Sequence, residues 1–157
     1  MKWLIIVIML FSFSSAAQVQ QPSEARPKKE IPGTPSFRMD QQQSKKSAVF
    51  QHIENGIRKS TVEEFEKDLA ALISIAIGSG QHGYFSKNQA ASVLSGYFSG
   101  RRPVSFEFSR THEQGAAPYA TGRFVYVQKG NQESVQVYVS LTRQDSRWVI
   151  SQFNIYE

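Results

Sequence analysis

Four segments of alternating apolar and polar residues fill the C-terminal third of the chain and constrain its fold more than any other feature. They lie at about residues 104–109, 119–128, 135–142 and 148–156. Alternation with a period of two is typical of strands that bury one face, and the turns between these segments are short. Because short connections join antiparallel neighbours, we expect the chain to end in an antiparallel sheet.

Three helices are expected before this sheet. The first, over about residues 47–59, has an apolar stripe made of Val49, Phe50, Ile53 and Ile57. A capping-box pattern at Ser60 and Glu63 predicts a second, short helix that ends near residue 69. The third follows Ser86, and its stripe comprises Ala90, Val93, Leu94, Tyr97 and Phe98.

A short strand is expected between the second and third helices. Ile73, Ile75 and Ile77 alternate along it, whereas residues 70–72 are compatible with helix or strand. The glycine-rich residues 78–83 then predict a turn, because glycine tolerates positive φ. This order of elements predicts an α+β fold with helices on one face of a sheet.

The same order resembles an uncharacterised bacterial exported family of the nuclear-transport-factor-2-like superfamily, whose domains are cystatin-like cones. The resemblance covers residues 48–157 and is carried by the Tyr84-Phe85-Ser86-Lys87 entry to the third helix and by the closing strand at 147–155. It implies a curved antiparallel sheet of four main strands plus one short strand, wrapped around three helices. Such a cone leaves a cavity at its open end.

The N-terminus is expected to direct export. Lys2, the apolar run at residues 3–13 and the small residues before Ala17 form a signal-peptide pattern with cleavage near Ala17. The run is too short for a stable membrane span. The mature protein is therefore expected in the periplasm or the medium, and the sequence leaves that choice open. The chain has no cysteine, so no disulfide is expected there.

Residues 18–47 are expected to form a disordered, basic linker rich in proline and glutamine, and residues 48–157 a single domain. The linker holds six basic and three acidic residues, a net charge of +3. A nucleic-acid-binding domain carries its basic charge on a folded face. Because most of the excess charge lies in the linker, we expect no nucleic-acid partner.

Two further patterns carry little chemistry. Residues 78–83 spell G-x-G-x-x-G, with Glu107 beyond them, as in a dinucleotide site. The helix begins too late for Gly83 to open it, and the strands that follow are antiparallel rather than part of βαβ units, so no cofactor is expected. His52, His82 and His112 are far apart in sequence and have no second ligand at a metal-binding spacing, so no metal is expected either.

Arg123 is the first candidate for a ligand-binding residue. Alternation places it on one face with Tyr119, where a guanidinium inside the cone would hold the polar end of a small amphipathic ligand. The alternatives are that this face is the solvated outer one or that Arg123 pairs with Glu107. Tyr97 and Phe106 are the other candidates, as pocket wall or as core. Gln152 and Asn154 are expected on one face with Trp148, Ile150 and Tyr156.

The outer face of the sheet offers a second kind of site. Tyr138, flanked by Gln136 and Ser140, presents an aromatic ring among polar neighbours, which suits a protein interface or a homodimer. Some enzymes of the resembled superfamily are isomerases or dehydratases that use an acid or His base in the cavity. Here the only acid expected in the last four strands is Glu107, which should face out, so we name no catalytic residues and expect a non-catalytic domain. The unknown partner is then a small ligand or an envelope protein.

Overall fold

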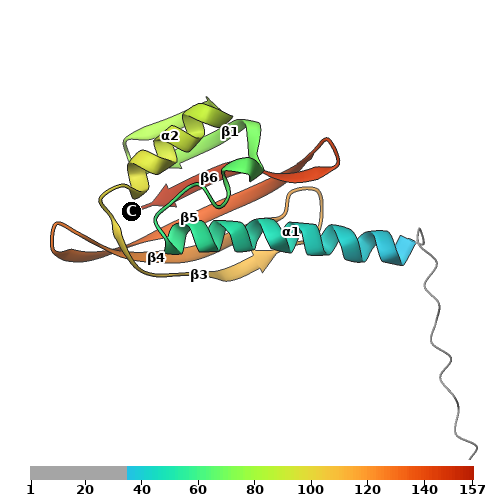
Figure 1. Ribbon diagram of the computed structural model, residues 1–157, viewed down its shortest axis with the longest axis horizontal. Helices are drawn as coiled ribbons and strands as arrows, with labels where there is room; N and C mark the ends of the chain where they lie inside the picture. Colours follow the sequence, from blue (N-terminus) through green and yellow to red (C-terminus); the bar gives the residue numbers. More distant parts are fainter. Residues whose placement is uncertain (1–34) are drawn as a thin grey trace, which may run out of the picture. The chain divides into compact units, whose positions relative to one another are not determined.

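The computed structural model describes residues 35–157; at residues 35–40, 42 and 43 it describes the backbone alone. The expected signal peptide and residues 18–34 of the expected linker lie outside the described residues. Within residues 35–157, no helix is both long and apolar enough to cross a bilayer. The elements are α1 (Pro35–Arg58), η1 (Glu66–Asp68), β1 (Leu69–Ile77), β2 (Gln81–Ser86), α2 (Lys87–Phe98), β3 (Arg102–His112), β4 (Tyr119–Gln128), β5 (Asn131–Gln144) and β6 (Arg147–Tyr156) (Figure 1).

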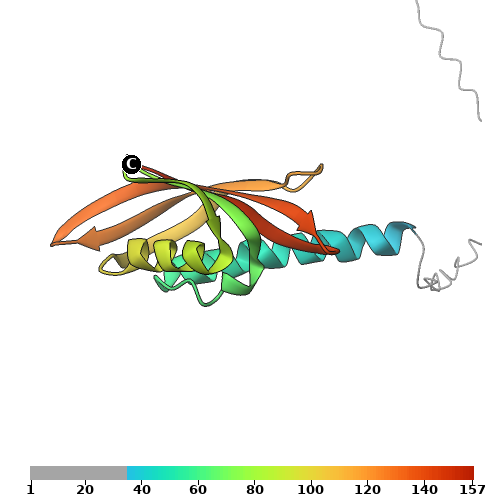
Figure 2. The same ribbon diagram turned by 90° about the horizontal axis from the view of Figure 1, so that it is seen from above.

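The strands form one six-stranded sheet in the order β2-β1-β6-β5-β4-β3. All neighbours are antiparallel except β1 and β6, which run parallel, so the sheet is mixed. The sheet is bent, and both helices lie on its concave side (Figure 2). The α+β class and the four antiparallel strands at the end of the chain are confirmed. The expected count of one short strand and three helices is wrong.

β2 is the strand that the sequence did not predict. Gly78, with φ of 48°, and Gly80, whose N–H donates to the Ile77 carbonyl at 3.1 Å, make a tight turn. The chain then returns antiparallel to β1, and Gly83 pairs with Ile75 inside the strand. Only the first half of the glycine-rich stretch is therefore a turn. Residues 70–72 belong to β1.

The expected helix at residues 60–69 is reduced to the 3-10 turn η1. Ser60 lies in the turn after α1 with φ of 52°, and its hydroxyl donates to the Arg101 carbonyl at 2.9 Å instead of capping a helix. Phe65 is fully buried and anchors this connection in the core. Its ring stacks on Phe153 of β6 with centroids 5.9 Å apart.

The two other helices bury the expected stripes. Val49, Phe50, Ile53 and Ile57 of α1 are buried, although α1 begins at Pro35 rather than near residue 47. At the start of α2, the Ser86 backbone N–H donates to Gln89 Oε1 at 3.0 Å, which gives the predicted N-cap. Ala90, Leu94, Tyr97 and Phe98 of α2 are buried, and Val93 is half-buried.

α1 also covers the outer edge of β3. Arg58 Nε donates to the Phe106 carbonyl at 2.7 Å, and the Phe108 N–H donates to Glu54 Oε1 at 2.9 Å. These side chains satisfy backbone groups that an edge strand otherwise leaves unpaired. The helix therefore covers this edge of the sheet at the middle of β3.

Candidate functional site

The space between the sheet and the helices, where a cone would hold a ligand, is occupied by aromatic side chains. Phe98 contacts both Phe124 and Phe153, with centroids 5.8 and 6.5 Å away, and Phe124 continues the chain of contacts to Phe106 at 6.4 Å. Phe106 is 2% exposed. Of the two interpretations that the sequence left open for Phe106, pocket wall or core, the structure therefore shows the core. Aromatic packing of this kind fills the interior and fixes the position of α2 on the sheet.

Tyr97 lies at the end of this aromatic chain, where α2 ends beside the β4–β5 hairpin. Its ring is covered by the Arg101 guanidinium, whose Cζ lies 3.8 Å from the ring centroid, and Arg101 Nη1 also donates to the Tyr97 carbonyl. Burial raises the pKa of Tyr97, and the neighbouring phenol of Tyr126 raises it further. The phenol is therefore neutral at physiological pH.

Two polar atoms in this cluster have no hydrogen-bond partner. They are the Tyr97 hydroxyl and Arg101 Nε, and both are buried. Tyr126 is satisfied, because its hydroxyl donates to Glu133 Oε2 at 3.0 Å. Glu133 is an acid in the last four strands that the sequence analysis did not predict. It was missed because β5 begins at Asn131, four residues before the first apolar residue of the alternating pattern, Val135. Unsatisfied buried donors are costly, which makes this cluster a candidate for a polar ligand group.

Arg123 and Tyr119 lie on the other face of the sheet, which neither helix covers (Figure 2). Along β4, residues 120, 122, 124 and 126 are buried, whereas 119, 121, 123, 125 and 127 are exposed or half-buried. The shared face of Arg123 and Tyr119 is confirmed, and it is the outer one. The structure therefore does not bring the four expected ligand residues together, because Tyr97 and Phe106 lie inside.

Gln136, Tyr138 and Ser140, the expected interface residues, share the outer face with Arg123 and Tyr119. The register pairs Tyr119 with Ser140, Thr121 with Tyr138, and Arg123 with Gln136. Tyr138 is half-buried, Gln136 is exposed and Ser140 is buried at 7% exposure. The expected ligand residues of β4 and the expected interface residues of β5 thus form one surface.

An aromatic stack crosses this surface. The ring of His112 on β3 stacks on Tyr119 with centroids 5.3 Å apart, and Tyr119 stacks on Tyr138 at 5.7 Å. The sequence placed His112 in a loop. Its position follows from the β3–β4 register, which places His112 opposite Tyr119 and which the sequence pattern alone does not give. Face-to-face contacts of this kind hold the rings in one orientation on the exposed side of the sheet.

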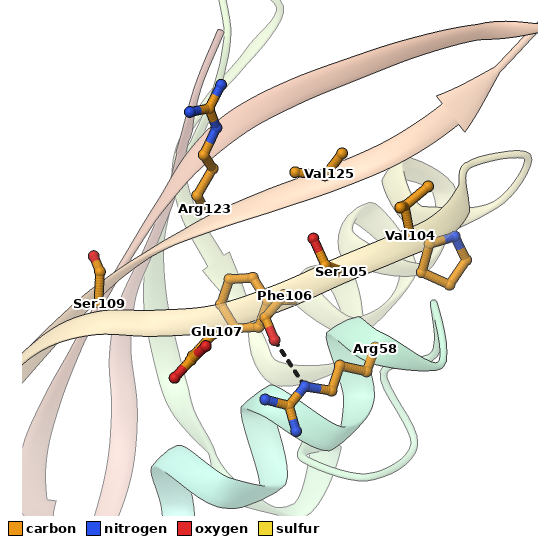
Figure 3. A pocket seen from close by; sticks show the side chains of 9 residues that line it. Arg58, Val104, Ser105, Phe106, Glu107, Ser109, Arg123 and Val125 are labelled. Carbon is orange, nitrogen blue, oxygen red and sulfur yellow. Dashed lines mark hydrogen bonds between the residues drawn. The ribbon is translucent and has the colours of Figure 1, made fainter.

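Two hollows meet at Arg123. One, of about 660 Å³, lies over β3 and β4, and the other, of about 430 Å³, extends toward Gln136 and Tyr156; both are also lined by Ser109. Figure 3 shows the Arg123 side chain extending away from Glu107 and from Arg58. Arg123 Nη2 donates to Ser134 Oγ at 2.8 Å. Its guanidinium retains further donors for a partner, since it carries five N–H groups.

Asn154 is a second polar feature of the outer face. It lies opposite Tyr138 in the register and is 6% exposed. Its Nδ2 donates to the Tyr156 hydroxyl at 2.9 Å, while its Oδ1 has no partner. The expected grouping of Gln152 and Asn154 with Trp148 and Ile150 is wrong, because the bulge at Ser151 shifts the register and turns Ile150 into the core.

The histidines and acids show no metal site within residues 35–157: no group of three or more such side chains is close enough to hold an ion. His52 Nδ1 lies 2.7 Å from Asp68 Oδ2, which ties α1 to η1. Glu107 is exposed on the outer face, as expected. These acids and histidines occupy structural or solvated positions.

A family model described as a domain of unknown function, DUF4783, matches residues 50–156. The chain belongs to this family. Its fold is similar to that of a DUF4783 protein from Bacteroides uniformis, with a TM-score of 0.62 and 15% identity over 68% of this chain and 94% of that one. A DUF4783 protein from Bacteroides fragilis gives a TM-score of 0.60 at 13% identity, over 68% of this chain and 95% of that one.

The wider superfamily is also represented. An NTF-2-like protein of unknown function from Shewanella oneidensis is similar with a TM-score of 0.53 and 10% identity, over 73% of this chain and 98% of that one. No match was found among curated proteins. The expected resemblance to an uncharacterised nuclear-transport-factor-2-like family is thus confirmed.

Proposed function

We propose that this DUF4783 domain is an interaction module that works through the outer face of its sheet, and that a second copy of the chain is its partner there. The observation that carries the proposal is the His112–Tyr119–Tyr138 stack on the face that no helix of residues 35–157 covers. Aromatic side chains with neutral polar neighbours are enriched in the buried centre of protein interfaces.

The charges of this face favour a second copy. Arg123 and Glu107 are opposite each other in the register and carry opposite charges, and no ion pair joins them. Two copies related by a twofold axis present the same surface to each other in inverted orientation. Each Arg123 then has a carboxylate available on the other copy.

The experiment is sedimentation velocity over a range of protein concentrations. The unmodified protein should form a dimer, and Tyr138→Asp should make it a monomer, because it places a charge at the centre of the proposed interface. The matched control is Gln51→Asp, which adds the same charge at an exposed position of α1. If Tyr138→Asp unfolds the domain, Tyr119→Ser provides the second test. A monomer at every concentration, or a dimer that Tyr138→Asp leaves intact, contradicts the proposal.

Binding of a small amphipathic ligand is the second candidate function. The buried, unpartnered Tyr97 hydroxyl and Arg101 Nε favour it, since a carboxylate or phosphate oxygen accepts from both kinds of donor. Native mass spectrometry of protein purified from cells tests it. A bound adduct that is lost in Tyr97→Phe and kept in Tyr84→Phe supports this function. Tyr84 is the control because it is 77% exposed and does not belong to the buried cluster. Protein without an adduct contradicts it.

We also propose that the protein is exported. The support is the N-terminal pattern of Lys2, the apolar run through Phe13 and the small residues that end at Ala17. N-terminal sequencing of protein from the cell envelope and the medium tests this proposal. A mature chain that begins near Gln18 is the expected result, and a chain that keeps Lys2 contradicts it.

A further inference from the structure

The two edges of the sheet differ in how their backbone groups are treated. At the β3 edge, Arg58 and Glu54 bond to the backbone of Phe106 and Phe108. At the β2 edge, within the described part of the chain, only the N–H of Ser86 at the strand's end donates to a side chain, that of Gln89. In an antiparallel pair, every second residue of an edge strand turns its N–H and C=O away from its neighbour. β2 therefore offers a row of unpaired backbone donors and acceptors.

β2 is accessible as well as unpaired. Five of its six residues are exposed, and the sixth, Phe85, is half-buried. Tyr84 is 77% exposed on the outer face, opposite Ser74 of β1, and Leu72, two residues before Ser74, is 62% exposed. Natural proteins block open edges with charges, proline or covering elements, and β2 contains no Asp, Glu, Lys, Arg or Pro.

A groove runs between β2 and α2, on the helical side of the sheet. It consists of two hollows of about 640 and 390 Å³ that share Gln81, Ser92 and Val93. Phe85, Val93 and Ile77 provide apolar lining, Tyr97 also lines the smaller hollow, and polar residues of α2 and β2 line the rest. A side chain built at Gly96 meets no atom within 4 Å, so the groove is open along the helix.

The charge of the groove limits what it accepts. No Asp, Glu, Lys or Arg lines either hollow, and His82 lies at the rim. A charged side chain placed there loses water without gaining an ion pair, whereas an apolar one gains by burial. The groove therefore favours an uncharged, apolar side chain over a charged one.

We propose that the β2 edge and the groove beside α2 bind an extended polypeptide segment of a partner protein by strand addition. The segment's backbone pairs with the open edge of β2. Its alternate side chains point to opposite faces, so one apolar side chain enters the groove and its neighbour lies beside Tyr84. A small molecule can fill the groove but leaves the edge unpaired. This site lies at the opposite edge of the sheet from β3 and is independent of the pairing proposed for the outer face.

The test uses a random-peptide phage library as the probe, selected on the purified protein. Peptides with one apolar residue flanked by strand-forming residues should be enriched. A synthetic enriched peptide should slow hydrogen exchange of amides in Gln81–Ser86. Ser92→Trp fills the groove and should weaken binding of that peptide by at least about tenfold. The matched control is Ser95→Trp, which adds the same side chain at an exposed position of α2 that lines neither hollow.

Other outcomes overturn the proposal. These are a library without enriched sequences, peptides that Ser92→Trp binds as well as Ser95→Trp does, or peptides that leave the β2 amides unprotected. Concentration-dependent protection of β2 in the protein alone identifies a second copy as the occupant instead. A copurified small molecule that only Ser92→Trp displaces identifies a small-ligand groove instead.

Discussion

Arg123 and Glu107 are directly opposite on β4 and β3, yet Arg123 donates to Ser134 rather than to Glu107. The two side chains extend in different directions from neighbouring strands (Figure 3). Their charges are therefore available on the face that we propose as the interface. Even if Arg123 and Glu107 paired, an exposed ion pair would contribute little to stability, so we interpret these charges as groups for recognition.

Reversal of the Arg123 charge should weaken self-association. In Arg123→Glu, the new carboxylate faces Glu107 of the other copy, so a repulsive contact replaces an attractive one on each side of the twofold axis. We therefore expect the dimer dissociation constant to rise by about tenfold or more. The double variant Arg123→Glu with Glu107→Arg restores opposite charges across the axis and should recover much of the affinity. Sedimentation equilibrium measures both. Equal dissociation constants for the unmodified protein and Arg123→Glu contradict a role for Arg123.

Ionisation of Tyr97 should make the fold less stable at alkaline pH. The raised pKa of this phenol means that the unfolded chain releases its proton first, above the ordinary value of 10.0. The contribution of Tyr97 to the free energy of unfolding is therefore constant below that pH. Above it, the free energy of unfolding falls by at most about 1.4 kcal/mol per pH unit. Chemical unfolding of the protein and of Tyr97→Phe between about pH 9 and 11.5 measures the difference. Parallel pH profiles contradict the burial of an ionisable phenol at this site.

Tyr97→Phe should cost little stability at neutral pH. The hydroxyl that it removes is buried without a partner, and removal of such a group is close to neutral or stabilising. A loss of more than about 1 kcal/mol in urea unfolding indicates that the hydroxyl has a partner in solution.

Two glycines should respond in opposite ways to alanine. A Cβ at Gly122 lies 2.5 Å from the Glu107 carbonyl oxygen, which is backbone and must move, so Gly122→Ala should lose about 1–3 kcal/mol. A Cβ at Gly96 meets nothing within 4 Å, so Gly96→Ala should gain about 0.5–1 kcal/mol from helix propensity. Urea unfolding measures both. A stable Gly122→Ala variant contradicts the close β3–β4 packing.

Regular alternation made the faces of β4 predictable, and irregularity made those of β6 unpredictable. The β4–β5 register is continuous, so Arg123 and Tyr138 lie on the face that period-two spacing indicates. In β6, the bulge at Ser151 inserts one residue and reverses the side of everything before it. Ile150 and Phe153 are three residues apart and both buried, whereas unbroken alternation would place them on opposite faces, so an expectation based on strict alternation misplaces Ile150.

The remaining differences arise from tertiary contacts. Ser60 has the capping pattern of a helix, but its hydroxyl bonds to Arg101, a residue distant in sequence. β2 is polar and contains Gly83, so it lacks the alternation of a strand, and pairing with β1 makes it one. The outer-face candidates were found from the sequence, whereas the contribution of His112 depends on the β3–β4 register.

Single-cysteine cross-linking tests the central claim most directly. The chain has no cysteine, so a single cysteine introduced at Thr121, Gln136 or Tyr156, three accessible outer-face positions, reports only on its own surroundings. If a second copy covers the outer face, at least one of these three variants should form a disulfide-linked dimer under mild oxidation at dilute protein concentration. Gln51→Cys on α1 should form no disulfide-linked dimer. Cross-linking of all three outer-face variants at no more than the Gln51→Cys level would contradict the account.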